Sequence, residues 1–253
     1  MYAEERQQAM VREITGHGRR SVSALARSFA VTSETVRRDL SALERQGLVR
    51  RVHGGAVPAE SLSSLEASVS VRESVHREGK ERIARAAVPH LPPAGSTLLL
   101  DAGTTTGRLV ESLPRDTRLT VFTHSVPLAG RLAALPHVTL HLLPGRVRPT
   151  TQAAVGAETV AALNRIRVDV AVVGSNGCSV RHGLSTPDPD EAAVKRALVA
   201  AGTRVVALVD ASKIGVESTV SFAALSDVDT LVTDADLPPD HELHVHGPEV
   251  VPA

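Results

Sequence analysis

The sequence predicts two domains, an N-terminal winged helix-turn-helix and a C-terminal α/β domain with a mainly parallel sheet. First, residues 1–57 contain three helical patterns followed by a hairpin pattern. Second, strand-like apolar runs alternate with helical patterns over residues 76–237, which favours a parallel sheet with helices on both faces. Third, residues 1–57 hold 10 arginines against 6 acidic residues, whereas the remainder holds 18 basic and 22 acidic residues. A basic segment ahead of an acidic body suggests an anionic partner for the first domain only.

Length and composition exclude several classes of protein. The chain has 253 residues, 42% of them hydrophobic, which suits a folded chain and not a disordered or fibrous one. It lacks the roughly 18 consecutive apolar residues of a membrane span, and its acidic, polar start is unlike a signal peptide. We therefore expect a cytoplasmic protein that binds no membrane. A single cysteine, Cys178, excludes an internal disulfide and a cysteine-rich zinc module.

The first domain follows from helical spacing, capping residues and one hairpin pattern. Apolar residues at helical spacing predict a first helix over Glu4–Gly16 and a short second helix over Ala24–Phe29, which Ser23 can cap. After the third helix, Leu48–Val52 and His53–Val57 predict a small β-hairpin. Three helices and a hairpin in this order define a winged helix-turn-helix.

The third helix carries the predicted DNA contacts. Thr32 can cap it, Gly47 ends it, and Val36, Leu40 and Leu43 form a buried stripe at helical spacing. Its opposite face presents arginines that can bond bidentately to guanine or pair with phosphate. On an isolated helix such arginines are more often a solvated face, but the order of elements favours DNA. The predicted DNA-contacting residues are Ser33, Glu34, Thr35, Arg37, Arg38 and His53.

The rest of the chain divides into a linker, a second domain and a tail. Residues 58–75 are rich in Ser and Glu with weak periodicity, and they predict a linker in which a helix can form. Residues 76–237 predict the α/β domain, and the polar, Pro- and His-rich residues 238–253 predict a frayed tail. The predicted strands are Thr97–Leu100, Leu119–Phe122, Val138–Leu143, Val168–Val173, Val205–Val209 and Thr230–Val232. The predicted helices are Lys80–His90, Gly107–Leu113, Pro127–Leu135, Gly156–Asn164 and Glu191–Ala201.

Small and polar residues follow the predicted strands of the second domain. Ligands of a parallel sheet bind at the carboxyl ends of its strands. The run Ser96–Gly107 combines a buried strand, a loop of Gly and Thr residues and a helix start, which aims N–H groups and hydroxyls at one point. That arrangement suits a phosphate, although such a turn also occurs for steric reasons alone. Similar polar segments follow other strands at Thr123–Ser125, Gly145–Arg146, Gly174–Gly177 and Asp210–Lys213.

Lysine is rare in this chain, which has 3 lysines against 25 arginines. Lys195 lies four residues after Glu191 on one predicted helix, and Lys213 follows the fifth predicted strand. As a surface ion pair, Glu191 and Lys195 would contribute about 0.3–0.5 kcal/mol. Because this chain otherwise uses arginine for its positive charges, a lysine instead indicates a confined site that requires a compact positive charge.

Motif runs in the first domain carry a family resemblance. They are Ala3–Arg6, Val22–Ala26, Val31–Leu40 and Arg51–Ala56. In their order and spacing they resemble the DeoR family of bacterial transcription regulators, and the similarity extends over nearly the whole chain. Thr32 stands where the family usually has Ser, which preserves the hydroxyl cap. The resemblance implies a winged helix-turn-helix joined to a sugar-phosphate-sensing domain related to ribose-5-phosphate isomerase. Most members are repressors released by a phosphorylated sugar or related metabolite.

The resemblance also implies an effector pocket in the second domain. His124 departs from the Asn usual at its position, which we expect to alter the sugar that fits. The run Gly183–Lys195 looks closest to the branch associated with fructose and other phosphotransferase-system sugars. We expect the effector's phosphate on Gly103–Thr106 with Lys213 as counter-charge, and sugar hydroxyls donating to Asp101 and Glu191. The predicted effector-binding residues are Asp101, Gly103, Thr104, Thr105, Thr106, His124, Ser125, Gly145, Asn176, Thr186, Glu191, Lys195, Asp210 and Lys213.

Other classes of function fit the sequence less well. A sugar-phosphate isomerase-like enzyme is the main alternative, but related isomerases carry an aspartate-rich run where this chain has Gly174–Gly177, and a basic head has no role in one. An architectural DNA-bending protein would leave the strand-end loops unexplained. His241, His244 and His246 are interpreted as solvated rather than metal-binding, and Cys178 as a buried small hydrophobe. We expect no cofactor, metal or catalytic residue, and a homo-oligomer, dimer or tetramer, on double-stranded operator DNA.

Overall fold

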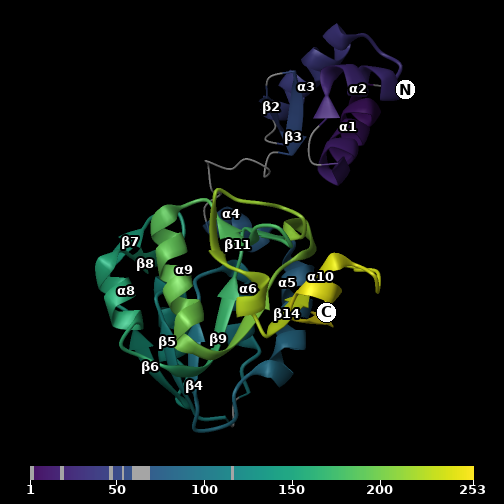
Figure 1. Cartoon of the computed structure of the whole chain (residues 1–253). Helices are drawn as coiled ribbons and strands as arrows, with labels where there is room; N and C mark the ends of the chain where they lie inside the picture. The colour runs from purple at the N-terminus through teal and green to yellow at the C-terminus, as the bar shows by residue number, and fades with distance from the viewer. Residues whose placement is uncertain (1–2, 18–19, 46–47, 53, 59–68, 115–116) are drawn as a thin grey trace. The chain divides into compact units, whose positions relative to one another are not determined.

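The computed structural model describes residues 3–17, 20–45, 48–52, 54–58, 69–114 and 117–253. The chain separates into two compact units, residues 1–65 and 66–253, each described here by itself (Figure 1).

The first unit is the predicted winged helix-turn-helix. Its three-stranded antiparallel sheet, in the order β1-β3-β2, includes a two-residue strand β1 that was not predicted from the sequence. Glycine is required at Gly55, because a Cβ there would lie 2.3 Å from the carbonyl oxygen of Arg20 across the sheet. The elements are α1 (Ala3–His17), β1 (Arg20–Ser21), α2 (Val22–Ser28), α3 (Ser33–Arg45), β2 (Val49–Val52) and β3 (Gly55–Pro58).

Helix caps in this unit confirm one prediction and correct another. The hydroxyl of Thr32 accepts a hydrogen bond from the amide of Thr35 at 3.2 Å, so it caps α3 as predicted. For α2 the cap is Ser21, which accepts from the amide of Ala24 at 3.0 Å, and the prediction of Ser23 was wrong. The helix begins at Val22, which places Ser23 inside its first turn. The core is formed by Met10, Ile14, Leu25, Val36, Leu40, Leu43, Val49 and Ala56.

The second unit is built on a seven-stranded sheet in the order β15-β14-β12-β9-β4-β5-β6. Every neighbouring pair in it is parallel, as the sequence predicted. All six predicted strands are present, β4 with the predicted ends and the others with ends shifted by at most three residues. The strands are β4 (Thr97–Leu100), β5 (Leu119–Thr123), β6 (Val138–Leu142), β9 (Val168–Gly174), β12 (Gly202–Leu208), β14 (Thr230–Thr233) and β15 (Glu249–Pro252).

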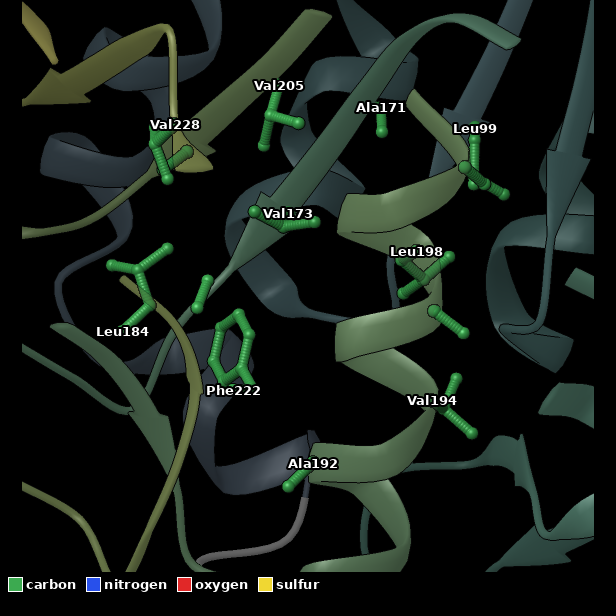
Figure 2. Close-up of a cluster of buried hydrophobic side chains, with 14 of the residues drawn as sticks. Leu99, Ala171, Val173, Leu184, Ala192, Val194, Leu198, Val205, Phe222 and Val228 are labelled. Atoms are coloured by element: carbon green, nitrogen blue, oxygen red, sulfur yellow. The ribbon is translucent and has the colours of Figure 1, made fainter. Parts of the chain in front are cut away.

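Helices cover both faces of this sheet (Figure 1). Alternate residues of one strand enter different cores: Leu98 and Leu100 of β4 pack with the α5, α6 and α7 side, whereas Leu99 packs with the α9 side. Figure 2 shows Leu198 of α9 near Leu99 and Ala171 in the second of these cores. The helices are α4 (Val69–Ser74), α5 (Arg77–Ala87), α6 (Thr104–Glu111), α7 (Val126–Ala133), α8 (Ala157–Leu163), α9 (Pro189–Ala201) and α10 (Glu242–His246), with short 3-10 turns at Val88–His90, Ala211–Lys213 and Leu225–Asp227.

Two small antiparallel sheets, which the sequence did not predict, accompany the main sheet. One is a hairpin of β7 and β8, and the other joins β10, β11 and β13. Their strands have three or four residues, too few for an alternating pattern to stand out. They are β7 (Arg146–Arg148), β8 (Ala153–Val155), β10 (Gly177–Ser179), β11 (Gly183–Thr186) and β13 (Val220–Ala223).

The expectation of a frayed polar tail over residues 238–253 was wrong. Strand β15 pairs in parallel with β14, with Val250 opposite Leu231 and Val251 opposite Val232. In α10, Leu243 is buried in the core beside the sheet. The Pro and His content obscured this short apolar run, and proline is tolerated at the end of an edge strand.

Candidate functional site

The sheet reverses its strand order between β4 and β9. From β4 the chain continues through α6 to β5 and then β6 on one side, while β9, β12, β14 and β15 extend the other side. In open parallel sheets, ligands bind outside the carboxyl ends of the strands at such a reversal. The residues that follow β4 and β9 therefore define the candidate site.

Asp101, the residue after β4, is the centre of a buried polar cluster. Its Oδ1 accepts from the amide of Ala102 at 2.8 Å and lies 3.0 Å from Nε2 of His124. Its Oδ2 accepts from the amide of Gly174 at 2.9 Å and from the ammonium of Lys195. Two partners on each oxygen use the whole acceptor capacity of a carboxylate. This structure contradicts the expectation that Asp101 accepts sugar hydroxyls, because the side chain is fully buried and joins the ends of β4, β5 and β9.

The environment of Asp101 keeps it ionised. Burial on its own would raise the pKa of this carboxyl, but the charge of Lys195 and the hydrogen bond with His124 lower the pKa to about 2. Nδ1 of His124 lies 2.8 Å from the carbonyl oxygen of Ala154, which fixes the orientation of the ring.

Lys195 is held in the interior and not at the surface. Its Nζ donates to Asp101 and to the carbonyl oxygen of Gly174 at 3.0 Å, and it lies 5.2 Å from the ring centroid of Phe222. Only 5% of the residue is exposed. The alternative of a surface ion pair between Glu191 and Lys195 was therefore wrong.

Glu191 has a different partner, one that the sequence analysis did not identify. Its Oε1 lies 2.9 Å from Nη1 of Arg148, which comes from β7 and also pairs with Asp188 at 3.2 Å. On the other side, Oγ1 of Thr186 lies 3.2 Å from Oε2 of Glu191 and 3.1 Å from Oδ1 of Asn176. One hydroxyl proton can serve only one of these acceptors at a time. Three predicted residues thus meet in one hydrogen-bonded group.

The threonine loop forms the first turn of α6. Gly103 is the N-cap residue, and Thr106 donates its hydroxyl to the carbonyl oxygen of Gly103 at 2.9 Å. Thr104 and Thr105 are also buried. First-turn N–H groups have no acceptor inside a helix, and the helix dipole favours an anion there.

The remaining predicted residues differ in their surroundings. Ser125 caps α7 through the amide of Leu128 at 3.4 Å, and Asp210 caps the 3-10 turn that ends at Lys213. Gly145 has φ +141° and packs against Thr159 of α8, which indicates a backbone role.

Lys80 was missed, although the rarity of lysine could have identified it. It lies in α5 and only 5% of it is exposed. Burial lowers the pKa of Lys80, Asp210 opposes that shift and Lys213 adds to it, so all three groups lie within electrostatic range.

The predicted DNA-contacting face of α3 is open to solvent. Ser33, Glu34, Arg37 and Arg38 are exposed and Thr35 is half-buried, while Val36 on the opposite face is buried. His53 lies outside the described residues. Asp39, which follows the two arginines, is buried and binds α1 through Nε of Arg6 at 2.7 Å and Nε2 of Gln7 at 2.9 Å. The sequence analysis did not assign it that role.

The described part of the chain lacks two further features. None of the helices there has the length and apolar character needed to cross a bilayer. In the same part of the chain, no three His, Cys, Asp or Glu side chains are grouped as metal ligands would be.

The first unit is a winged helix-turn-helix whose third helix has an exposed basic face. The second unit is built on a parallel sheet with a buried ionic cluster where its strand order reverses. Together they define a DNA-binding regulator with a sensor domain. Comparison with family models agrees: residues 6–61 match the DeoR-like helix-turn-helix domain, and residues 75–235 match the DeoR C-terminal sensor domain. The chain belongs to the DeoR family of transcriptional regulators.

Relatives with this arrangement match over almost their full length. The chain is 36% identical to the HTH-type transcriptional regulator GlpR of Haloferax volcanii, over 99% of this chain and 98% of that protein. It is 31% identical to the glycerol-3-phosphate regulon repressor of Escherichia coli, over 92% of each. It is 32% identical to the uncharacterized HTH-type transcriptional regulator FruR of Bacillus subtilis, over 93% of each. A solved ribose 5-phosphate isomerase A from Methanocaldococcus jannaschii matches 55% of this chain and 54% of that one, with a TM-score of 0.41 and 17% identity.

Proposed function

We propose that this chain is a repressor of sugar-metabolism genes that binds operator DNA through α3 and is released by a phosphorylated sugar or polyol. The observation that carries the proposal is the buried Asp101–Lys195 pair at the strand reversal, next to the first turn of α6. The pair lies at the carboxyl ends of β4 and β9, where parallel sheets bind their ligands, and it fixes the backbone of both strand ends. Relatives named as repressors, one of them of a glycerol-3-phosphate regulon, support the same function.

The geometry suggests where each part of the effector binds. The phosphate fits the N–H groups and hydroxyls of Thr104 and Thr105, with Lys213 as counter-charge. The sugar hydroxyls meet Asn176, the half-buried member of the group that it forms with Thr186 and Glu191. Asp101 then acts as a positioning residue that fixes Lys195 and the loop after β4.

The paired acids also support a regulator over the isomerase alternative. A general base needs a carboxylate free to take a proton from the substrate. In this structure Asp101 is paired with Lys195 and Glu191 with Arg148. We therefore expect no turnover of sugar phosphates.

A two-fold symmetric homo-oligomer in the cytoplasm completes the proposal. A single recognition helix covers only one half-site, so a dimer or tetramer on a pseudo-palindromic operator is expected. Light scattering of the purified chain with and without operator gives the number of copies directly.

Thermal unfolding against a panel of phosphorylated sugars and their parent sugars tests the effector class. A ligand at 100 times its Kd adds about 2.7 kcal/mol of stability, which only the phosphorylated form should supply. Thr105→Val keeps the shape but removes a hydroxyl donor, and should lower effector affinity by about 1–3 kcal/mol. Thr230→Val, a buried threonine at the amino end of β14, is the matched control. Equal binding of the parent sugar, or normal binding by Thr105→Val, contradicts the placement on this loop.

A further inference from the structure

Helix α4 is the first described element after residues 59–68, which connect the two units in sequence. It belongs to the second unit, and ion pairs and hydrogen bonds connect it to three elements around the candidate site. These elements are α6, α5 and the turn between β7 and β8.

The tie to α6 is ionic. Oε1 of Glu73 lies 2.8 Å from Nη2 of Arg108 and 3.7 Å from Nη2 of Arg131 in α7. The Arg108 side chain is only 9% exposed, so this pair is shielded from water better than most surface pairs. Arg108 lies on the same helix whose first turn is the proposed phosphate site.

The tie to α5 is made by Lys80. Its buried ammonium donates to the carbonyl oxygens of Arg72 at 2.6 Å and Val75 at 2.7 Å, at the C-terminal end of α4. A cation at the C-terminal end of a helix accepts no bond but donates to the last carbonyl oxygens, and it interacts favourably with the negative end of the helix dipole. The same ammonium lies within electrostatic range of Asp210 and Lys213, at the strand end proposed to meet the phosphate.

The third tie reaches the β7–β8 turn. The amide of Val69, which begins α4, donates to the carbonyl oxygen of Thr150 at 2.9 Å. The same hairpin contributes Arg148, the partner of Glu191. The start of α4 is thus attached to the β7–β8 turn, and its C-terminal end is attached to α6 and α5.

We propose that α4 transmits effector binding to the DNA-binding unit, and that Glu73 and Lys80 are the residues that hold it. The inference rests on the proposed function. An anion bound at the first turn of α6 acts on the helix that carries Arg108, and so weakens the Arg108–Glu73 ion pair that holds α4. Loosening of α4 then reaches the first unit through the continuous chain.

The variant Glu73→Gln tests this without requiring a known effector. Glu111→Gln is the matched control, since Glu111 also pairs with Arg108 and Arg131, each at 3.3 Å, but lies on α6 itself. Operator DNA selected by the wild-type chain is titrated with each full-length variant in the absence of added ligand. We expect Glu73→Gln to weaken operator binding by about fivefold or more, the lower end of typical coupling between sites, and Glu111→Gln to stay near wild type.

Hydrogen exchange supplies a second readout. Amides of residues 69–75 should exchange faster in Glu73→Gln than in Glu111→Gln. Faster exchange alone would show only that Glu73 stabilises α4 locally. A change in operator affinity shows in addition that the state of α4 affects the DNA-binding unit. If both variants bind operator like wild type, α4 does not transmit the signal. Failure of the proposed function has another signature: wild-type operator binding that is unaltered by glycerol 3-phosphate, fructose 1-phosphate and inorganic phosphate.

Discussion

At the scale of single residues, the contacts of Asp101 decide how the sensor unit is held together. The carboxylate joins the end of β4 to His124 after β5, to Gly174 of β9 and to Lys195 of α9. Removing one partner of a buried ion pair leaves the other charge buried and unpaired. This lowers the free energy of unfolding by more than the intact pair raises it.

Asp101→Asn should therefore destabilise the sensor unit by about 3–5 kcal/mol. Asp190→Asn is the control, because Asp190 makes a 2.8 Å ion pair with Arg146 in which both side chains are more than half exposed. That exposed pair should contribute less than about 1 kcal/mol. Urea unfolding followed by circular dichroism measures both. Equal effects of the two substitutions would contradict the role assigned to Asp101.

The lowered pKa of Asp101 also predicts a pH dependence. Its folded-state pKa of about 2 lies below the ordinary value of 3.8, so its contribution is complete above pH 4 and is lost as the pH falls through 2. The wild-type chain should therefore lose about 2 kcal/mol more between pH 5 and pH 2 than Asp101→Asn. Unfolding free energies of both chains at these pH values are the measurement. Parallel pH profiles would show that this carboxyl does not titrate as described.

The sequence predicted Asp101, Glu191 and Lys195 as site residues, and the alternative that it left open, a surface pair of Glu191 with Lys195, was wrong. Spacing of four residues brings Glu191 and Lys195 to one helix face, and says nothing about partners elsewhere in the chain. The Lys195–Asp101 contact spans 94 residues of sequence, and Arg148 reaches Glu191 from a hairpin that was not predicted. Such partners depend on tertiary structure and have no local signature.

At the scale of elements, α3 combines a buried stripe, an exposed basic face and a buried Asp39. The Asp39 contacts to Arg6 and Gln7 attach α3 to α1, so the basic face is presented on a fixed support. Arg37 lies 3.7 Å from Glu34, and both side chains are more than half exposed, so the pairing leaves Arg37 available to DNA.

Arg38→Ala should abolish operator binding, and Arg37→Ala should weaken it by about 1–3 kcal/mol if Arg37 contacts a base. Arg12→Ala removes an exposed arginine from α1 and serves as the control. Operator titrations at several salt concentrations separate base contacts from phosphate contacts, since loss of a phosphate contact lowers the salt dependence across all sequences. Unchanged affinity in both α3 variants would exclude this face as the DNA contact.

The long elements were predictable and the short ones were not. Apolar runs of three residues or more, bounded by polar segments, predicted six strands of the main sheet, because buried parallel strands are almost continuously hydrophobic. The three-residue strands β7, β8 and β10 and the edge strand β15 lack such runs. Helix α4 fell inside the predicted linker, since six residues show no clear period.

At the scale of the whole molecule, a basic DNA-binding unit and an acidic sensor unit are joined in one chain. The unit boundary between Leu65 and Glu66 lies before the predicted start of the second domain at residue 76, so α4 belongs to the sensor. An effector can release DNA only by binding one conformation of the chain more tightly than another, typically by 1–3 kcal/mol. Release of DNA by a phosphorylated effector therefore requires such a difference in affinity between two conformations of this chain.

Operator binding measured by fluorescence anisotropy, with a phosphorylated sugar and its parent sugar added in turn, tests for that difference most directly. The panel should include glycerol 3-phosphate and fructose 1-phosphate, at fixed salt. The account predicts that one phosphorylated compound weakens operator binding by about 5–150-fold, while its parent compound leaves the affinity unchanged. Operator affinity that stays constant across the panel, or that falls equally with the parent compound, would contradict it.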